Sequence, residues 1–222
     1  VARTLAGSHV VIVGATGVLG ARIAAHFAAA GARVSAIVRD HTRLDGSSVA
    51  QYALADVTDH AALSTALASV APFDGVVNAT GVVAFGNVGD LDDATLARLF
   101  AVNAVAPIVM LRESAPHLAD GGFFINLSGV VATQPVAGMA AYSASKAAAW
   151  AAMSAAAREL RRRRIDVIDA RPPHTETGLA TRPIAGVAPK MPQGLTPDAV
   201  AARIVAAVVA GERDLPAESF TS

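Results

Sequence analysis

The chain opens with a β-branched apolar run that ends at a glycine-rich turn and continues into an alanine-rich stretch. Residues 9–13 read His-Val-Val-Ile-Val, residues 14–20 carry three glycines, and the following stretch ends at Gly31. A short, continuous β-branched run is typical of a strand buried on both faces of a parallel sheet. The chain therefore begins with a strand, a tight turn and a helix, a unit found in α/β folds.

The same alternation continues to the end of the chain. Further strands are predicted over residues 33–38, 50–54, 75–78, 123–127 and 165–170, with a short seventh at 214–216. Helices are predicted over residues 61–70, 91–118, 140–164 and 198–210, with a bend at Pro107. Alternating strands and helices predict one doubly wound parallel sheet, a Rossmann fold of six to seven strands with helices on both faces, spanning residues 1–222 as one domain.

The segment 172–197 is rich in proline and glycine and follows the sixth predicted strand. In a doubly wound sheet, loops at the carboxyl ends of the strands line the ligand crevice. We therefore expect this segment to be a substrate lid, with residues 86–90 contributing to the same pocket.

Composition excludes several classes of function. The 222 residues are 53% hydrophobic and carry 18 basic and 18 acidic side chains, so neither nucleic acid nor an anionic membrane is an expected partner. Cysteine is absent and the histidines lack metal-ligand spacing, so no metal site is expected. We see no signal peptide and no apolar run near the roughly 18–20 residues that span a bilayer, and expect a cytoplasmic protein.

The first turn has the spacing of a phosphate-binding loop. Its glycines allow the backbone to turn tightly and approach a pyrophosphate, which would meet the positive end of the following helix. The residues expected to contact the cofactor here are Gly14, Thr16, Gly17, Val18, Leu19 and Gly20.

The second and third strands end in charged residues that bear on the choice of cofactor. Arg39 follows an apolar strand tip, and an arginine there accommodates the 2′-phosphate of NADP. Asp40 keeps NAD(H) possible, because an acid in that region bonds the ribose 2′-hydroxyl. We favour NADP(H). After the third strand, Asp56 would accept a bond from the adenine amino group, beside Val57.

Tyr142 and Lys146 stand four residues apart on a predicted helix and therefore share one face of it. An ammonium near a phenol favours the phenolate and lowers the tyrosine pKa. Tyr142 is thus the candidate general acid for carbonyl reduction and the candidate base for the reverse reaction.

Taken together, these motifs resemble the short-chain dehydrogenase/reductase family over nearly the whole chain. The resemblance rests on residues 14–20, 56–57, 78–81 and 142–146 and on Asn103, in the family's order and spacing. It implies a Rossmann fold, NAD(P)(H) binding and hydride transfer between a nicotinamide and a carbonyl or alcohol. It also implies that Tyr142 is the acid/base, that Lys146 holds the ribose and tunes Tyr142, and that Asn103 supports a water relay. The implied cofactor wall comprises Asn78, Ala79, Gly81, Pro172, Thr175 and Thr177.

The sequence departs from the family pattern at several positions. The middle glycine is Gly17 instead of residue 18, a spacing more like that of the family's extended or atypical branches. Pro173 replaces the usual glycine. Gly129 stands where the substrate-polarising serine is expected, and Ser128 precedes it. We expect Ser128 to serve as the displaced polariser if the local backbone turns it inward, with Thr133, Gln134 and His174 as substitutes.

Three functions follow as alternatives. The first is an NADP(H)-dependent ketone or aldehyde reductase, acting in either direction. The second is a cofactor-binding protein with weak or no catalysis, acting as a redox sensor or interaction protein. The third is an isomerase, epimerase or lyase on the same fold. The alanine-rich face of residues 147–157 and the family's habit of pairing through this helix predict a homodimer or homotetramer.

Overall fold

The computed structural model describes residues 2–44, 46 and 48–220. Its centre is a six-stranded parallel sheet in the order β3-β2-β1-β4-β5-β6. The strands are β1 (His9–Val13), β2 (Arg33–Val38), β3 (Gln51–Leu54), β4 (Phe73–Asn78), β5 (Leu118–Leu127) and β6 (Asp166–Ala170). The strand order reverses between β1 and β4, so this is the doubly wound Rossmann arrangement that the alternation predicts.

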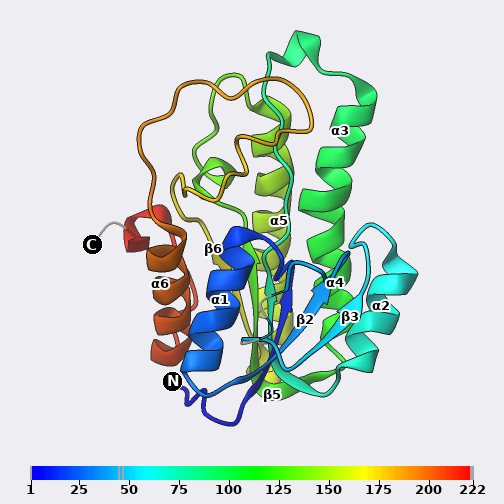
Figure 1. Ribbon diagram of the computed structural model, residues 1–222, viewed down its shortest axis with the longest axis vertical. Coiled ribbons are helices and arrows are strands. Elements are labelled where there is room, and N and C mark those ends of the chain that lie inside the picture. The colour runs from blue at the N-terminus through cyan, green and yellow to red at the C-terminus, as the bar shows by residue number, and fades with distance from the viewer. Residues whose placement is uncertain (1, 45, 47, 221–222) are drawn as a thin grey trace.

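Helices cover both faces of the sheet. The helices are α1 (Val18–Ala29), α2 (His60–Ser69), α3 (Asp93–Phe100), α4 (Ala106–Ser114), α5 (Ala140–Glu159) and α6 (Pro197–Ala210). Helices α1 and α6 lie side by side on one face, and α2, α3, α4 and α5 cover the other (Figure 1). Short helical turns complete the chain: η1 (Val88–Asp90), η2 (Ala101–Val105), η3 (Val130–Ala132), η4 (Leu160–Arg163) and η5 (Ala217–Phe220).

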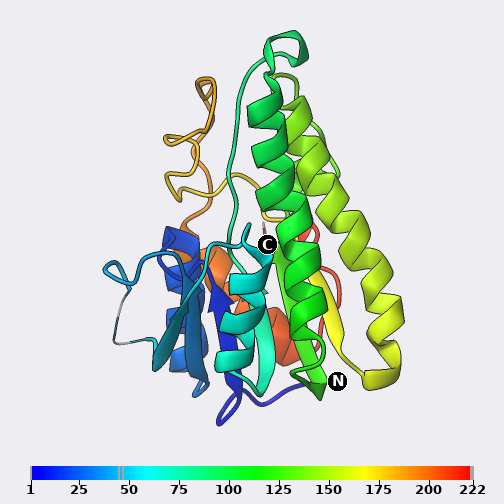
Figure 2. The same ribbon diagram turned by 90° about the vertical axis from the view of Figure 1, so that its right-hand side faces the viewer.

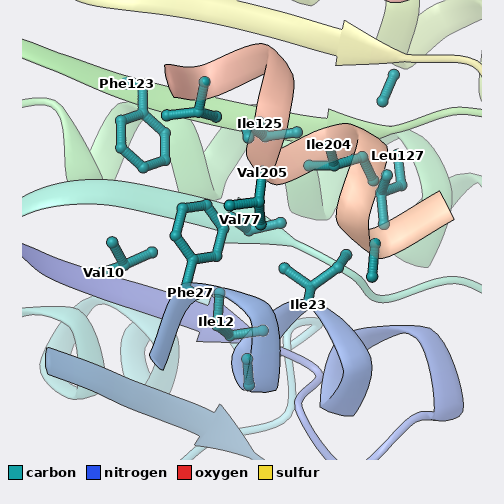
Figure 3. Packing of buried hydrophobic residues seen from close by; sticks show 14 of the residues in the cluster. Val10, Ile12, Ile23, Phe27, Val77, Phe123, Ile125, Leu127, Ile204 and Val205 are labelled. Atoms are coloured by element: carbon teal, nitrogen blue, oxygen red, sulfur yellow. The ribbon is translucent and has the colours of Figure 1, made fainter. Parts of the chain in front are cut away.

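The core follows from the alternation of side chains along the strands. Beneath α1 and α6, Phe27 stacks on Phe123 with ring centroids 5.8 Å apart. Apolar side chains of β1, β4 and β5 surround this pair, and Ile204 and Val205 close it from α6 (Figure 3). These side chains are almost fully buried, which fixes the sheet's register and therefore the positions at which its strands end.

The long helix predicted over residues 91–118 is shorter and less regular than expected. Asp92 caps its start by accepting from the Thr95 backbone N–H, and the helix ends at Ser114 because residue 118 already belongs to β5. Between α3 and α4 the segment Ala101–Val105 is a π-helical turn, just before Pro107. A proline early in α4 leaves backbone groups of the preceding turn without their α-helical partner, and the wider turn accommodates this.

Two other element boundaries need correction. The seventh strand is reduced to a single bridge between Leu215 and Ala170, with the Arg171 N–H donating to the Leu215 carbonyl at 2.9 Å. The helix predicted to reach residue 164 ends as an α-helix at Glu159 and finishes in the 3-10 turn η4, after which Arg164 adopts a positive φ of 56°.

The helix Asp93–Ser114 is, by length and composition, long and apolar enough to cross a membrane. This corrects the expectation that no apolar stretch approaches that length. Half of its apolar window is buried inside the fold, as in the core helix of a globular protein. The helix packs beside α5, and both rise beyond the carboxyl ends of the strands (Figure 2).

Candidate active site

The glycine turn between β1 and α1 is shaped for close approach by a ligand. A Cβ added to Gly20 would lie 2.3 Å from the Gly14 carbonyl oxygen, so no side chain is tolerated there. Gly17 forms the N-cap of α1 without a side-chain cap, and the first turn of the helix carries no acid. The first backbone N–H groups of α1, from Val18 onward, are therefore open to an anion. This part of the site fits a dinucleotide pyrophosphate.

Charged side chains stand at the tips of β2 and β3, as the sequence predicts. Arg39 is 71% exposed, and its guanidinium lies 3.9 Å from a carboxylate oxygen of Asp56. Burial would raise the pKa of Asp56, but hydrogen bonds from Thr58 and the charges of Arg98 and Arg39 lower it overall.

Asp40 is engaged within its own loop. It accepts from the backbone N–H and the hydroxyl of Thr42, both at 2.9 Å, and these bonds lower its pKa. Arg39, by contrast, is largely exposed and lies beside Asp56, at the adenosine end of the predicted cofactor site.

Tyr142, Lys146 and Asn103 come together although they lie on two helical segments. A Cβ built on Gly81 would lie 3.3 Å from Lys146 Nζ and 3.5 Å from Asn103 Oδ1, so these two side chains meet at the loop after β4, and Tyr142 lies one turn before Lys146 on α5. Asn103 sits in the π-helical turn, where its amide donates to the Val82 carbonyl at 2.8 Å and accepts from the Val82 N–H at 3.0 Å.

The two titratable groups of this cluster have shifted pKa values. Burial lowers the pKa of Lys146 to about 8, an effect that the negative charge of Asp169 opposes. Burial raises the pKa of Tyr142 to about 12, which corrects the expectation of a lowered tyrosine pKa. Lys146 Nζ donates to the Leu127 carbonyl at 2.8 Å. At neutral pH the cluster therefore holds a phenol and an ammonium one helical turn apart.

A cavity of about 300 Å³ opens beside Tyr142. It lies between the loop after β4, the start of α5 and the predicted lid loop. Its lining is mostly apolar or backbone, and consists of residues Ala84, Phe85, Gly86, Asn87, Val88, Asp90, Leu91, Asp92, Leu99, Gly138, Met139, Ala140, Ala141, Tyr142, Ala185 and Gly186. The structure thus brings both predicted pocket segments, 86–90 and 172–197, to the candidate acid/base.

The lid loop is attached to the loop after β4 through the backbone. Ile184 N–H donates to the Val83 carbonyl at 2.8 Å, and Phe85 N–H donates to the Ala185 carbonyl at 3.0 Å. Within the lid, the Thr175 hydroxyl donates to the Pro173 carbonyl at 2.9 Å, and Thr177 Oγ1 accepts from the Leu179 N–H at 3.3 Å. The Pro172 carbonyl accepts from the Val130 N–H, which ties the start of the lid to the end of β5.

Ser128 does not line the cavity. Its side chain is buried, and its hydroxyl donates to a carboxylate oxygen of Asp169 on β6. Gly129 turns the chain with φ 83° and ψ 165°, yet this turn leaves Ser128 on the sheet. None of the substitutes Thr133, Gln134 and His174 is among the residues that line the cavity.

Asp169 belongs to a buried polar row that the sequence reasoning missed. Asn78, Asn126 and Asp169 occupy matched register positions on β4, β5 and β6. Asn78 donates to Asn126 at 2.9 Å, and Asn126 donates to Asp169 at 2.7 Å. The signal in the sequence was a polar residue near the end of three successive apolar strands. Recognising it required the strand order, because only neighbouring strands bring such residues into contact.

Fold and site together define a class of protein: a doubly wound α/β domain with a dinucleotide cradle and a Tyr-Lys-Asn cluster beside a cavity. The comparisons with known proteins agree. Residues 8–185 match the short chain dehydrogenase family, and the chain belongs to that family.

The similar proteins are oxidoreductases for the most part. An uncharacterized oxidoreductase of Methylorubrum extorquens is 30% identical over 172 residues, covering 75% of this chain and 68% of the relative. Galactitol 2-dehydrogenase (L-tagatose-forming) of Cereibacter sphaeroides is 33% identical over 158 residues, covering 65% of this chain and 62% of the relative. A crystal structure of a short chain dehydrogenase from Burkholderia cenocepacia in complex with NADP superimposes with a TM-score of 0.85 at 28% identity, covering 99% of this chain and 100% of that one.

Proposed function

We propose that this chain is an NADP(H)-dependent oxidoreductase that interconverts a carbonyl compound and the corresponding alcohol. The main support for this proposal is that Tyr142 lines the cavity and lies one helical turn from the buried ammonium of Lys146. A nicotinamide dinucleotide bound at the glycine turn would supply or accept the hydride. Solved relatives in complex with NADP support this choice of cofactor, together with the exposed Arg39.

In the reduction, the Tyr142 hydroxyl donates its proton to the substrate oxygen. A phenol with its pKa raised to about 12 is protonated at neutral pH, which suits this acid role. In the oxidation Tyr142 must accept a proton, and the ammonium of Lys146 stabilises the phenolate that does so. Asn103 fixes the loop at Val82 and so holds Gly81 against the Lys146 ammonium.

The cavity also bears on the class of substrate. Its lining contains no lysine, arginine or histidine, and its ionisable side chains are Asp90, Asp92 and Tyr142. An anionic substrate would be repelled by the two carboxylates and would meet no countercharge. We propose compact, uncharged ketones and aldehydes as substrates, to be compared with carboxylate-bearing analogues of the same skeleton.

The test is single-turnover oxidation of NADPH, followed at the nicotinamide absorbance, against a panel of ketones and aldehydes. We expect wild-type protein to turn over at least one of them and Tyr142→Phe to lose that activity. Tyr52→Phe is the matched control, since Tyr52 is 49% exposed on β3 and does not line the cavity. Equal activity in wild type and Tyr142→Phe would remove Tyr142 from the mechanism.

A second function is favoured by one observation, the bond from Ser128 to Asp169. With that hydroxyl committed and no side chain at Gly129, the serine position supplies no donor to the substrate carbonyl. Losing one such donor typically slows a reaction by about 10²–10³-fold. Relatives include an inactive 2-(S)-hydroxypropyl-CoM dehydrogenase 2 of Xanthobacter autotrophicus and a cyclic-di-GMP-binding biofilm dispersal mediator protein of Escherichia coli. Tight NADPH binding without oxidation by any carbonyl in the panel would favour a cofactor-binding protein.

Of the homodimer and homotetramer expected from the sequence, we propose the homodimer, formed through the outer face of the helix that runs from α3 to α4 and precedes the alanine-rich α5. Val105 and Ile108 are 41% and 45% exposed there, one turn apart. An aliphatic pair so exposed is stabilised when a second copy covers it. Light scattering after gel filtration should give a dimer for wild type and a monomer for Ile108→Glu. A monomeric wild-type protein would contradict this proposal.

A further inference from the structure

The buried row at the strand ends contains one ionisable side chain that the proposed chemistry does not use. Asp169 is 5% exposed, and its two carboxylate oxygens accept hydrogen bonds from Ser128 and Asn126. Burying a carboxylate is costly unless it is hydrogen-bonded and close to a positive charge. The two donors supply the hydrogen bonds, and nearby cations must supply the positive charge.

The Lys146 ammonium lies beyond ion-pair distance of this carboxylate but close enough for their charges to interact, and the end of β5 binds both groups. Lys146 Nζ donates to the Leu127 carbonyl at 2.8 Å, and the next residue, Ser128, donates its hydroxyl to Asp169. Leu127 and Ser128 are consecutive residues at the end of β5, and the first binds the cation while the second binds the anion. Burial raises the pKa of Asp169 to about 6, and the hydrogen bonds from Ser128 and Asn126 and the charges of Arg171 and Lys146 oppose that rise. Burial lowers the pKa of Lys146, and the charge of Asp169 opposes that fall.

The other cation facing Asp169 is shared between two carboxylates. Arg171 Nη1 lies 3.7 Å from Asp169 Oδ1, while Arg171 Nη2 donates to Asp214 at 2.7 Å, and the guanidinium lies over the Trp150 ring at 5.9 Å. Among the described residues, the charged or titratable groups around Asp169 are thus Lys146 on α5 and the Arg171–Asp214 pair at the end of β6. Lys146 has no carboxylate within ion-pair distance in the part of the chain that the structure describes. The negative charge that acts on its pKa is that of Asp169.

We propose that Asp169 is a positioning residue of the active site, which keeps the Lys146 ammonium charged and holds Ser128 against the sheet, away from the substrate. This inference rests on the proposed function, because it gives Asp169 its role through Lys146 and Tyr142. Burial alone favours a neutral lysine, and a neutral lysine would no longer stabilise the Tyr142 phenolate. The same bond accounts for the position of Ser128, whose hydroxyl is drawn to the carboxylate.

The chain offers a direct way to observe this interaction. It has only two lysines, Lys146 and Lys190, so protein labelled with ¹³C at lysine Cε gives two signals, which Lys190→Arg assigns. In wild type we expect Lys146 to titrate near pH 8 and its signal to shift additionally near pH 6, where Asp169 ionises. The absence of any inflection near pH 6 would overturn the proposal without requiring a variant.

The variant that tests the charge is Asp169→Asn, which is nearly isosteric and keeps an oxygen for the Ser128 hydroxyl. We expect the Lys146 titration to move down by about one pH unit, since the nearby opposite charge is lost. Asp120→Asn is the matched control: it removes an exposed carboxylate that pairs with Arg163, in the first part of β5, and should leave Lys146 unchanged. An unchanged Lys146 titration in folded Asp169→Asn protein would also overturn the proposal.

Kinetics separate this inference from the proposed function. If a carbonyl is reduced, the alkaline limb of the wild-type rate profile should move to lower pH in Asp169→Asn, whereas a merely structural loss would lower the rate equally at every pH. If no carbonyl is reduced, the proposed function fails, and the lysine titration still decides whether Asp169 sets the charge of Lys146.

Discussion

Gly129 occupies the place of the serine expected in the family, and restoring that serine is predicted to destabilise the fold. At φ 83° and ψ 165° the residue lies in a region of backbone space that is essentially restricted to glycine. Placing another residue there costs about 1–3 kcal/mol. The backbone is held by neighbouring hydrogen bonds, in which Gly129 donates to Ala170 at 3.2 Å and Val130 to Pro172 at 3.0 Å.

Space does not account for this cost. A Cβ on Gly129 would lie 3.7 Å from the nearest atom, the Pro172 carbonyl oxygen, which is an ordinary contact. The penalty for Gly129→Ser is therefore backbone strain alone. For a domain of this size 1 kcal/mol lowers the melting temperature by about 2–4 °C, so a fall of about 2–12 °C is expected.

The assay is thermal unfolding followed by circular dichroism, with urea unfolding as a second measure. Gly89→Ser is the control, because its Cβ would meet no atom within 4 Å and its φ is not positive; it should change stability by no more than about 0.5 kcal/mol. A melting temperature of Gly129→Ser equal to that of wild type would refute the reasoning, because the backbone after β5 would then adapt to a side chain freely.

Three further predictions concern the cofactor site and pH. Gly20→Ala should weaken NADPH binding measured by calorimetry, since its Cβ would lie 2.3 Å from the Gly14 carbonyl; unchanged affinity would mean that the turn relaxes easily. Arg39→Gln should weaken NADPH binding by about tenfold or more, the value of a lost bond to a charged group, and leave NADH binding unchanged; an equal loss for both would argue against 2′-phosphate recognition. Burial, the largest cause, lowers the pKa of His9 from 6.5 in the folded protein. As the pH falls, His9 is therefore protonated in the unfolded chain before it is protonated in the folded one. Stability should therefore fall as the pH drops below 6.5, and in His9→Gln the urea midpoint should depend less on pH between pH 5 and pH 7. A parallel fall of the midpoint in both proteins would exclude His9 as the cause.

Most of the fold could be predicted because local sequence decides it. Strands such as His9–Val13 are continuous β-branched runs, and Gly31 and the proline-rich segment mark element ends. The predicted element boundaries are wrong where pairing with a neighbouring element determines the structure. Residue 118 reads as helical, but it pairs with Phe73 in the sheet, and residues 214–216 form one bridge because only Leu215 reaches Ala170.

The site divides in the same way. Tyr142, Lys146 and Asn103 could be proposed because their spacing resembles that of the family, and the structure brings Lys146 and Asn103 together at Gly81. Asp169 could not, since its meaning depends on Asn126 and Ser128 of the neighbouring strand and on Lys146 of a helix. The direction of the Ser128 side chain likewise depends on a partner 41 residues away, to which the local sequence gives no clue.

The attachment of the lid has a consequence for how the lining of the cavity can vary. The wall of the cavity is fastened by main-chain bonds between residues 83–85 and 184–185, and such bonds do not depend on the identity of the side chains. A half-buried side chain on the wall, such as that of Ala185, can therefore be exchanged while the main-chain frame stays closed. The lining of this cavity can therefore vary in sequence without a compensating repair of the lid.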